Sequence, residues 1–202
     1  MRQILRWALA AVTALLVCAL SPGLARQDEK DEMVDNPLYK GWAKFKPGAR
    51  VTVIEKTTLG DSSVEEREVV YKLAEITPKR AVVETSVIER DLLSRIETSP
   101  TRIHYPAKVK KADLEAAQLE SGVKRGKETI KVMGKDLKCT TAEYSKKDKD
   151  AVITGKVWRS DTIPGGLAKR VRTTKEGDKL VAETVTTVSS YQIKPKAKKT
   201  ND

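Results

Sequence analysis

The segment Val157-Trp-Arg-Ser-Asp-Thr-Ile-Pro-Gly-Gly-Leu167 combines the residue types that most suggest a binding loop in this sequence. A large aromatic residue, Trp158, ends an apolar stretch and is followed by a Pro-Gly-Gly turn. The two glycines can adopt positive φ or let another backbone approach closely. The segment predicts either a loop at the rim of a ligand pocket or a tight strand connection capped by Trp158. In the first case the ligand-binding residues are Trp158, Ile163, Pro164, Gly165 and Gly166.

The residue types and motifs in the sequence give little support for a catalytic or metal-binding site. The chain has one histidine, His104, and two cysteines. One imidazole and one distant thiol do not make a zinc ligand set. His104 can be a general base, but its neighbours Tyr105 and Pro106 favour a surface or partly buried imidazole. No G-x-S-x-G, P-loop or H-E-x-x-H motif occurs. We therefore expect no catalytic residue, no metal and no cofactor, and a protein that is not an enzyme.

The first 25 residues have the three regions of a secretory signal peptide. Arg2 and Arg6 give the positive start, Ala8 to Leu20 is uncharged and mostly apolar, and small residues end at Ala25. The apolar run is shorter than the roughly 20 residues that a spanning helix needs, which disfavours an uncleaved anchor. We predict cleavage near Ala25, a secreted or periplasmic protein, and no transmembrane span in the mature chain.

Removal of this leader also removes Cys18 and leaves Cys139 as the single mature thiol. One thiol cannot form an internal disulfide bond. It is either reactive, for example toward a second molecule, or a buried small hydrophobe. The alternation of polar and apolar residues around Cys139 favours a strand in which the thiol is buried.

Periodicity in the rest of the chain indicates strands. The acidic stretch 26–36 is expected to be a flexible lead-in. Asn36 and Pro37 then form a good helix start, and Leu38, Trp42 and Phe45 recur at helical spacing. From Arg50 onward, alternation at period two and compact turns such as 60–63, 77–80 and 175–178 predict antiparallel strands. Residues 110–120 have the composition of a short helix or connector.

Charge suggests the kind of partner. The chain carries a formal net charge of +11, of which +9 remains after the leader is removed. A positive surface favours anionic polymers or membrane surfaces, although lysines also serve solubility alone. Nine aromatic residues in the whole chain are few for base stacking, so no specific nucleic-acid partner is expected.

Two short motifs resemble a known group. The residues G-K-x-L-x-C (Gly134, Lys135, Leu137, Cys139) and W-x-S…P-G-G (Trp158, Ser160, Pro164, Gly165, Gly166) are similar to those of exported proteins of planctomycete type. These proteins resemble the bacterial lipoprotein-localisation-factor superfamily at a distance. The resemblance covers roughly residues 36–191. It implies a strongly curved antiparallel half-barrel closed over by helices around an apolar cavity.

The sequence thus predicts a mainly β fold, a single curved antiparallel sheet arranged as a half-barrel-like meander, with one or two short helices. We expect a signal peptide at 1–25, a lead-in at 26–36, a β-domain at 37–192 and a disordered basic tail at 193–202. The expected function is an exported, non-enzymatic binding or interaction protein that holds an apolar ligand in the concavity of the sheet. The alternative is a basic module that binds anionic envelope polymers or a membrane surface. The sequence leaves the oligomeric state open.

Overall fold

The computed structural model describes residues 32–90, 95–117 and 121–193. The predicted signal peptide and most of the predicted basic tail lie outside the described residues. No helix in the described ranges is long and apolar enough to cross a membrane.

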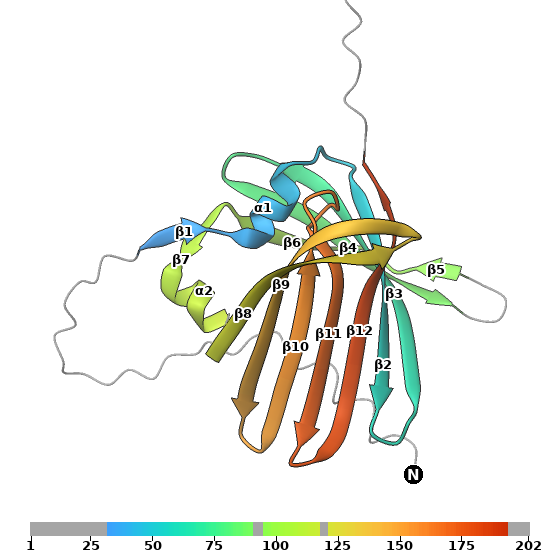
Figure 1. Cartoon of the computed structure of the whole chain (residues 1–202). Coiled ribbons are helices and arrows are strands. Elements are labelled where there is room, and N and C mark those ends of the chain that lie inside the picture. The colour runs from blue at the N-terminus through green and yellow to red at the C-terminus, as the bar shows by residue number, and fades with distance from the viewer. Residues whose placement is uncertain (1–31, 91–94, 118–120, 194–202) are drawn as a thin grey trace, which may run out of the picture. The chain divides into compact units, whose positions relative to one another are not determined.

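The described residues form two helices and twelve strands (Figure 1). The helices are α1 (Pro37–Ala43) and α2 (Lys111–Ala117). The strands are β1 (Met33–Asp35), β2 (Arg50–Leu59), β3 (Val64–Ile76), β4 (Arg80–Arg90), β5 (Arg95–Glu97), β6 (Thr101–Pro106), β7 (Lys108–Lys110), β8 (Ser121–Val132), β9 (Lys135–Asp148), β10 (Ala151–Arg159), β11 (Leu167–Glu176) and β12 (Lys179–Gln192). This confirms the predicted mainly β fold.

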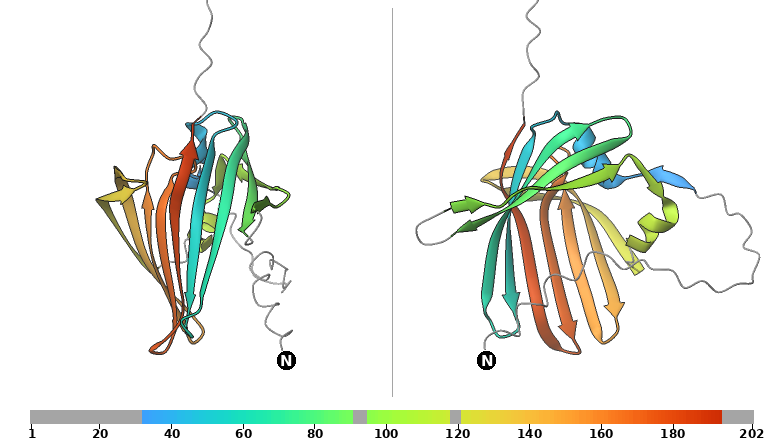
Figure 2. Two further views of the ribbon diagram at one scale, coloured as in Figure 1. Left: turned by 90° about the vertical axis from the view of Figure 1, so that its right-hand side faces the viewer. Right: turned by 180° about the vertical axis from the view of Figure 1, so that it is seen from behind.

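Ten of these strands make one antiparallel sheet in the order β5-β4-β3-β2-β12-β11-β10-β9-β8, with β6 also paired to β4. Two meanders, β2 to β6 and β8 to β12, are therefore joined where β2 pairs with β12. The described end strands β5 and β8 do not pair with each other, so the sheet stays open. Figure 2 shows that β4 and β6 run at a steep angle to β10, β11 and β12, which reflects the twist of the sheet.

Helix α1 forms where Asn36 and Pro37 predict its start. The Asn36 side chain accepts a hydrogen bond from the Leu38 amide at 3.0 Å and caps the first turn. Trp42 and Phe45 are buried as the helical spacing predicts, whereas Leu38 is 42% exposed and Tyr39 packs against the core in its place. The helix packs against β3, β4 and β6.

The N-terminal region is ordered earlier than the sequence suggests. Strand β1 lies inside the stretch 26–36, where we expected a flexible lead-in, and pairs with β7 as a separate two-stranded sheet. The Asn36 amide donates to the Ala107 carbonyl, and its side-chain nitrogen donates to the Pro106 carbonyl, both at 2.9 Å. These two hydrogen bonds hold Asn36, directly after β1, against residues about 70 positions further along the chain. Local sequence does not reveal such partners, so the strand was not predicted.

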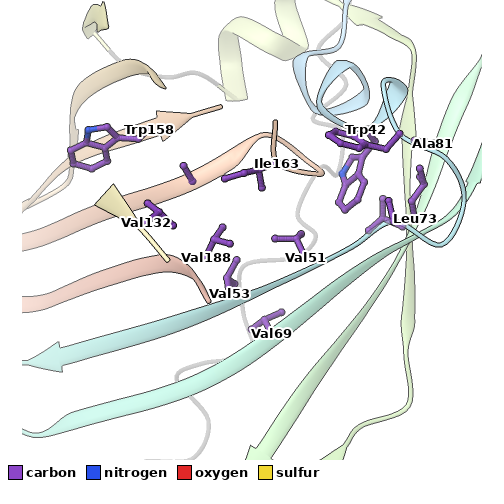
Figure 3. Packing of buried hydrophobic residues seen from close by; sticks show 14 of the residues in the cluster. Trp42, Val51, Val53, Val69, Leu73, Ala81, Val132, Trp158, Ile163 and Val188 are labelled. Atoms are coloured by element: carbon purple, nitrogen blue, oxygen red, sulfur yellow. The ribbon is translucent and has the colours of Figure 1, made fainter. Parts of the chain in front are cut away.

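We call the sheet face that carries Val53, Val69 and Val188 the inner face, and these three side chains belong to the buried core of the protein. Small and β-branched side chains dominate it (Figure 3). Its buried members are Trp42, Phe45, Ala49, Val51, Val53, Val69, Leu73, Ala81, Val83, Val132, Cys139, Trp158, Ile163, Ala168 and Val188. The far end of the β8–β9 hairpin bends over the sheet and brings β8 into contact with β12. Val132 at that end is therefore buried although it precedes a hairpin turn.

Candidate functional site

Trp158, the first of the predicted ligand-binding residues, has protein partners on several sides. Its side chain is 9% exposed, and its indole N–H donates to Glu128 Oε2 at 2.8 Å. The ammonium groups of Lys156 and Lys169 lie 5.2 and 5.4 Å from the ring centroid, within cation–π range. These contacts hold the indole in place at the end of β10.

The Pro-Gly-Gly turn is docked on α1. Gly165 and Gly166 have φ of 77° and 78°, which L side chains rarely adopt. The Gly165 amide donates to the Gly41 carbonyl at 3.0 Å, and Trp42 packs against Gly165. Ile163 and Pro164 are buried, with under 2% of each residue exposed. The ligand-binding role of these residues stays a prediction; in this structure each of them packs against the protein.

A groove lies beside this loop on the inner face, over the middle of β8, the first half of β9 and the end of β10. It consists of two hollows, of about 490 and 480 Å³, which share Lys127, Thr140 and Arg159. Because the lining includes several cationic side chains, we call it the basic groove. Its lining residues are Arg125, Gly126, Lys127, Glu128, Thr129, Lys138, Cys139, Thr140, Thr141, Ala142, Val157, Arg159, Ser160, Asp161 and Thr162.

Strand alternation places the groove residues. On β8, Arg125 and Lys127 are two positions apart and so point to one face, as do Lys138 and Thr140 on β9. The strand pairing sets Lys127 opposite Thr140, and Thr140 opposite Arg159 on β10. Directly opposite residues of neighbouring strands share a face. The register therefore gathers these side chains on one side of the sheet.

The groove has more positive charge than its own acids neutralise. Among the described residues, none of Arg125, Lys127, Lys138 and Arg159 forms an ion pair with a carboxylate. The two acids in the lining are already paired outside it. Glu128 pairs with Lys156 at 2.6 Å and Asp161 pairs with Lys44 at 2.8 Å.

Arg159 is in an unusual electrostatic position within this groove. It keeps contact with solvent, but the protein around it takes away part of its hydration. This desolvation lowers the pKa of Arg159 from its usual value, and the nearby charge of Arg170 lowers it further. The guanidinium remains charged at neutral pH, because an arginine pKa starts far above that range. A bound anion would relieve both effects.

The cationic character continues across the inner face. Val157 of β10 lies opposite Arg170 of β11, which lies opposite Thr186 of β12. The next residues in the same row are Glu55 and Arg67. Arg67 donates to Glu55 Oε2 through Nε at 2.7 Å, and Arg170 Nη2 lies 3.4 Å from Glu55 Oε1. Burial of Tyr71, together with the charge of Glu55, raises the pKa of that phenol.

A third hollow, of about 520 Å³, lies where β4 diverges from β3. Three aliphatic side chains line it, Ile54, Val87 and Ile88, but so do charged residues of β3. Its lining thus mixes apolar and charged groups in similar amounts. The charged lining residues are Glu66, Arg67 and Glu68.

The two residues considered for metal or thiol chemistry, Cys139 and His104, lie on different strands, β9 and β6. Cys139 is 4% exposed, which confirms the predicted burial, and burial raises the pKa of its thiol. His104 lies exposed on β6. Within residues 32–90, 95–117 and 121–193, no three side chains of His, Cys, Asp or Glu gather closely enough to hold a metal ion.

Comparison with known proteins gives structural likenesses only. No family model matches the chain, and no curated protein matches it in sequence. A proposed lipoprotein of Parabacteroides distasonis aligns at a TM-score of 0.40 and 12% identity, covering 72% of this chain and 97% of that one. A proposed exported protein of Bacteroides fragilis with a YmcC-like fold aligns at 0.39 and 10%, covering 73% and 97%.

A LolA superfamily protein of Nitrosomonas europaea aligns at a TM-score of 0.25 and 10% identity, covering 79% of this chain and 93% of that one. All three scores are below 0.5, so we draw no functional argument from them. The planctomycete-type resemblance of the two sequence motifs stays a prediction.

Proposed function

We propose that this chain is an exported, non-enzymatic binding protein whose basic groove holds an anionic ligand. The observation that carries the proposal is the set of four cationic side chains, Arg125, Lys127, Lys138 and Arg159, which have no carboxylate partner among the described residues. Unmatched charges of one sign in a hollow raise the local concentration of counter-ions and of charged ligands. Export rests on the predicted signal peptide.

The lining of the groove favours an anionic ligand over a purely apolar one. Val157 and Ala142 are the main aliphatic residues in it, and they alternate with threonines and cations. Pockets for apolar ligands are lined mainly by hydrophobic and aromatic side chains, with few polar groups. The aliphatic parts of lysine, arginine and threonine can still contact the carbon skeleton of an anionic molecule.

Equilibrium binding to soluble polymers tests this proposal. The probes are polygalacturonate, which carries carboxylates, and dextran sulfate, which carries sulfate esters, with neutral dextran as the blank. The variant Lys127→Gln/Arg159→Gln removes two groove charges. Its matched control, Lys147→Gln/Lys175→Gln, removes two exposed lysines on β9 and β11 outside the groove lining.

We expect the groove variant to lose affinity about tenfold and the control less than about threefold, if each exposed charge contributes roughly 0.7 kcal/mol. Binding should also weaken as salt is added, because the contacts are screened. If neither charged polymer binds better than neutral dextran, the proposal is wrong. If the two variants lose equal affinity, the net charge of the protein binds the polymer and the groove does not.

A further inference from the structure

The row formed by Lys127, Thr140 and Arg159 places a threonine hydroxyl between two cations. Thr140 is directly opposite Lys127 on one side and directly opposite Arg159 on the other. Neighbouring strands are about 4.8 Å apart, so both cationic residues start from adjacent positions on the sheet. Their side chains are long enough to reach the space above Thr140.

A third cation approaches Thr140 along its own strand. Lys138 is two residues before Thr140 on β9, so it shares the face at a distance of about 6.7 Å along the strand. It lines the same hollow as Thr140, Lys127 and Arg159. Cations therefore flank the threonine from three directions in the plane of the sheet.

The threonine hydroxyl is available to a ligand. Thr140 is exposed, and its Oγ1 donates to the Arg159 carbonyl at 3.5 Å, a long and weak hydrogen bond that an anionic acceptor would replace. A hydroxyl can donate one hydrogen bond and accept others. The floor of the cluster thus offers a donor, and its sides offer two ammonium groups and one guanidinium.

We propose, on the basis of the function proposed above, that this cluster is a subsite for a tetrahedral oxyanion, the phosphate or sulfate ester group of a larger molecule. A planar carboxylate presents two oxygens in one plane, which a single arginine can satisfy. A terminal phosphate or sulfate presents three oxygens in different directions. Three cations placed around one hydroxyl match the second arrangement, and they compensate the double charge of a phosphate monoester or the single charge of a sulfate ester.

The ion pairs of the neighbouring acids support this assignment. A dianion is repelled by free carboxylates, and the lining contains Glu128 and Asp161. Glu128 pairs with Lys156, which Glu143 shares, and Asp161 pairs with Lys44, so both acids are partly neutralised from outside the lining. The charge that a ligand would meet in the subsite is therefore dominated by its cations.

Calorimetric titration of the mature chain tests the subsite with glycerol 1-phosphate, inorganic sulfate and acetate. We expect both tetrahedral anions to bind at least about tenfold more tightly than acetate, because each presents more oxygens and a second negative charge to the three cations. Binding of the phosphate monoester should strengthen between about pH 5 and pH 7, since its second pKa is about 6, while sulfate binding should stay constant.

Two variants address the subsite itself. Thr140→Val keeps the β-branched shape and removes the hydroxyl, and Lys138→Gln removes one cation. Their controls are Thr154→Val, on the other face of β10, and Lys147→Gln. We expect each subsite variant to weaken the binding of glycerol 1-phosphate at least about threefold, and the controls to leave it unchanged. The affinity of Thr140→Val for polygalacturonate should change little.

A vesicle arm separates the sources of the phosphate group. Vesicles of phosphatidylcholine with phosphatidic acid present the monoester on a membrane, and vesicles of phosphatidylcholine alone are the blank. If the protein binds the vesicles with phosphatidic acid and Lys138→Gln weakens this binding, the ligand of the subsite is a lipid headgroup. If the protein binds glycerol 1-phosphate but not these vesicles, the ligand is a soluble ester.

If acetate binds as tightly as sulfate and Thr140→Val has no effect, the tetrahedral subsite is wrong. The anion-binding function then still stands, provided that the groove binds polygalacturonate. If no anionic probe binds at all, both proposals fail together.

Discussion

Arg170 and Glu55 lie 3.4 Å apart between Nη2 and Oε1, although 115 positions separate them in the chain. They are one strand removed from each other, on β11 and β2, with Thr186 of β12 between them. The Glu55 side chain is 8% exposed, and Arg67 supplies its shorter contacts. A nearly buried carboxylate thus connects the two meanders of the sheet on its inner face.

We predict that Glu55→Gln lowers the free energy of unfolding by about 1–3 kcal/mol, because it removes charge-assisted hydrogen bonds to two arginines. Urea denaturation monitored by circular dichroism measures the change. The matched control is Glu75→Gln, which breaks an exposed pair with Arg80 and should cost less than about 0.5 kcal/mol. Equal losses in the two variants would show that the burial of Glu55 has no energetic importance.

Gly165 and Gly134 allow backbone strain to be separated from steric overlap. Both have positive φ, but a side chain at Gly134 meets nothing within 4 Å, whereas one at Gly165 meets Trp42 at 2.9 Å. Gly134→Ala should cost about 1–2 kcal/mol from conformation alone. Gly165→Ala should cost at least about 1 kcal/mol more, because Trp42 must move. Thermal unfolding measures both, and equal shifts in Tm would contradict the docking of the loop on α1.

Trp158 should contribute to stability in two separable ways. We expect Trp158→Ala to cost about 3–5 kcal/mol, since it deletes a large buried side chain. Trp158→Phe keeps an aromatic ring and loses the hydrogen bond to Glu128, so it should cost about 1–2 kcal/mol. Polygalacturonate binding by folded Trp158→Phe should equal that of the parent, because Trp158 does not line the basic groove. A loss of affinity without a loss of stability would instead support the predicted rim loop.

Cys139 should be unreactive in the folded protein. Its burial, and to a lesser degree the charge of Glu128, raise the pKa of the thiol, so the nucleophilic thiolate is scarce at neutral pH. A thiol reagent should label the native chain at least about tenfold more slowly than the urea-unfolded chain at the same pH. Labelling at equal rates would show that the strand opens readily and would favour a role for the thiol in contacts between molecules.

Acid should destabilise the fold partly through Glu84. Hydrogen bonds from Lys72 and then Arg102 hold the pKa of Glu84 below its usual value. A depressed pKa stabilises the folded state above the unfolded-state pKa, about 4.3, and this contribution is lost as the pH falls through the folded-state pKa. Glu84→Gln should therefore show a smaller loss of stability between pH 5 and pH 3 in urea titrations. An unchanged pH dependence would mean that other carboxylates account for it.

Local sequence alone determined the long strands from Arg50 onward, the turns at 60–63, 77–80 and 175–178, and the start of helix α1. Alternation at period two forms a strand wherever one face is buried, and Asn36 with Pro37 caps α1 without help from distant residues. Even the row Lys127, Thr140 and Arg159 follows from local signals. The turns at Met133-Gly134 and Lys149-Asp150, with positive φ at Met133, Gly134 and Lys149, fix the register of both hairpins.

The tertiary structure decided what the local pattern leaves open. Pairing of β2 with β12, and hence the contact between Glu55 and Arg170, depends on packing Val53 against Val188 across more than a hundred residues of chain. The ordering of Met33 to Asp35 likewise needs β7 as a partner. The unmatched positive charge of the basic groove also depends on the tertiary structure. Glu128 and Asp161 are close to its cations in the sequence, but folding pairs them with Lys156 and Lys44, because ion pairs depend on positions in space.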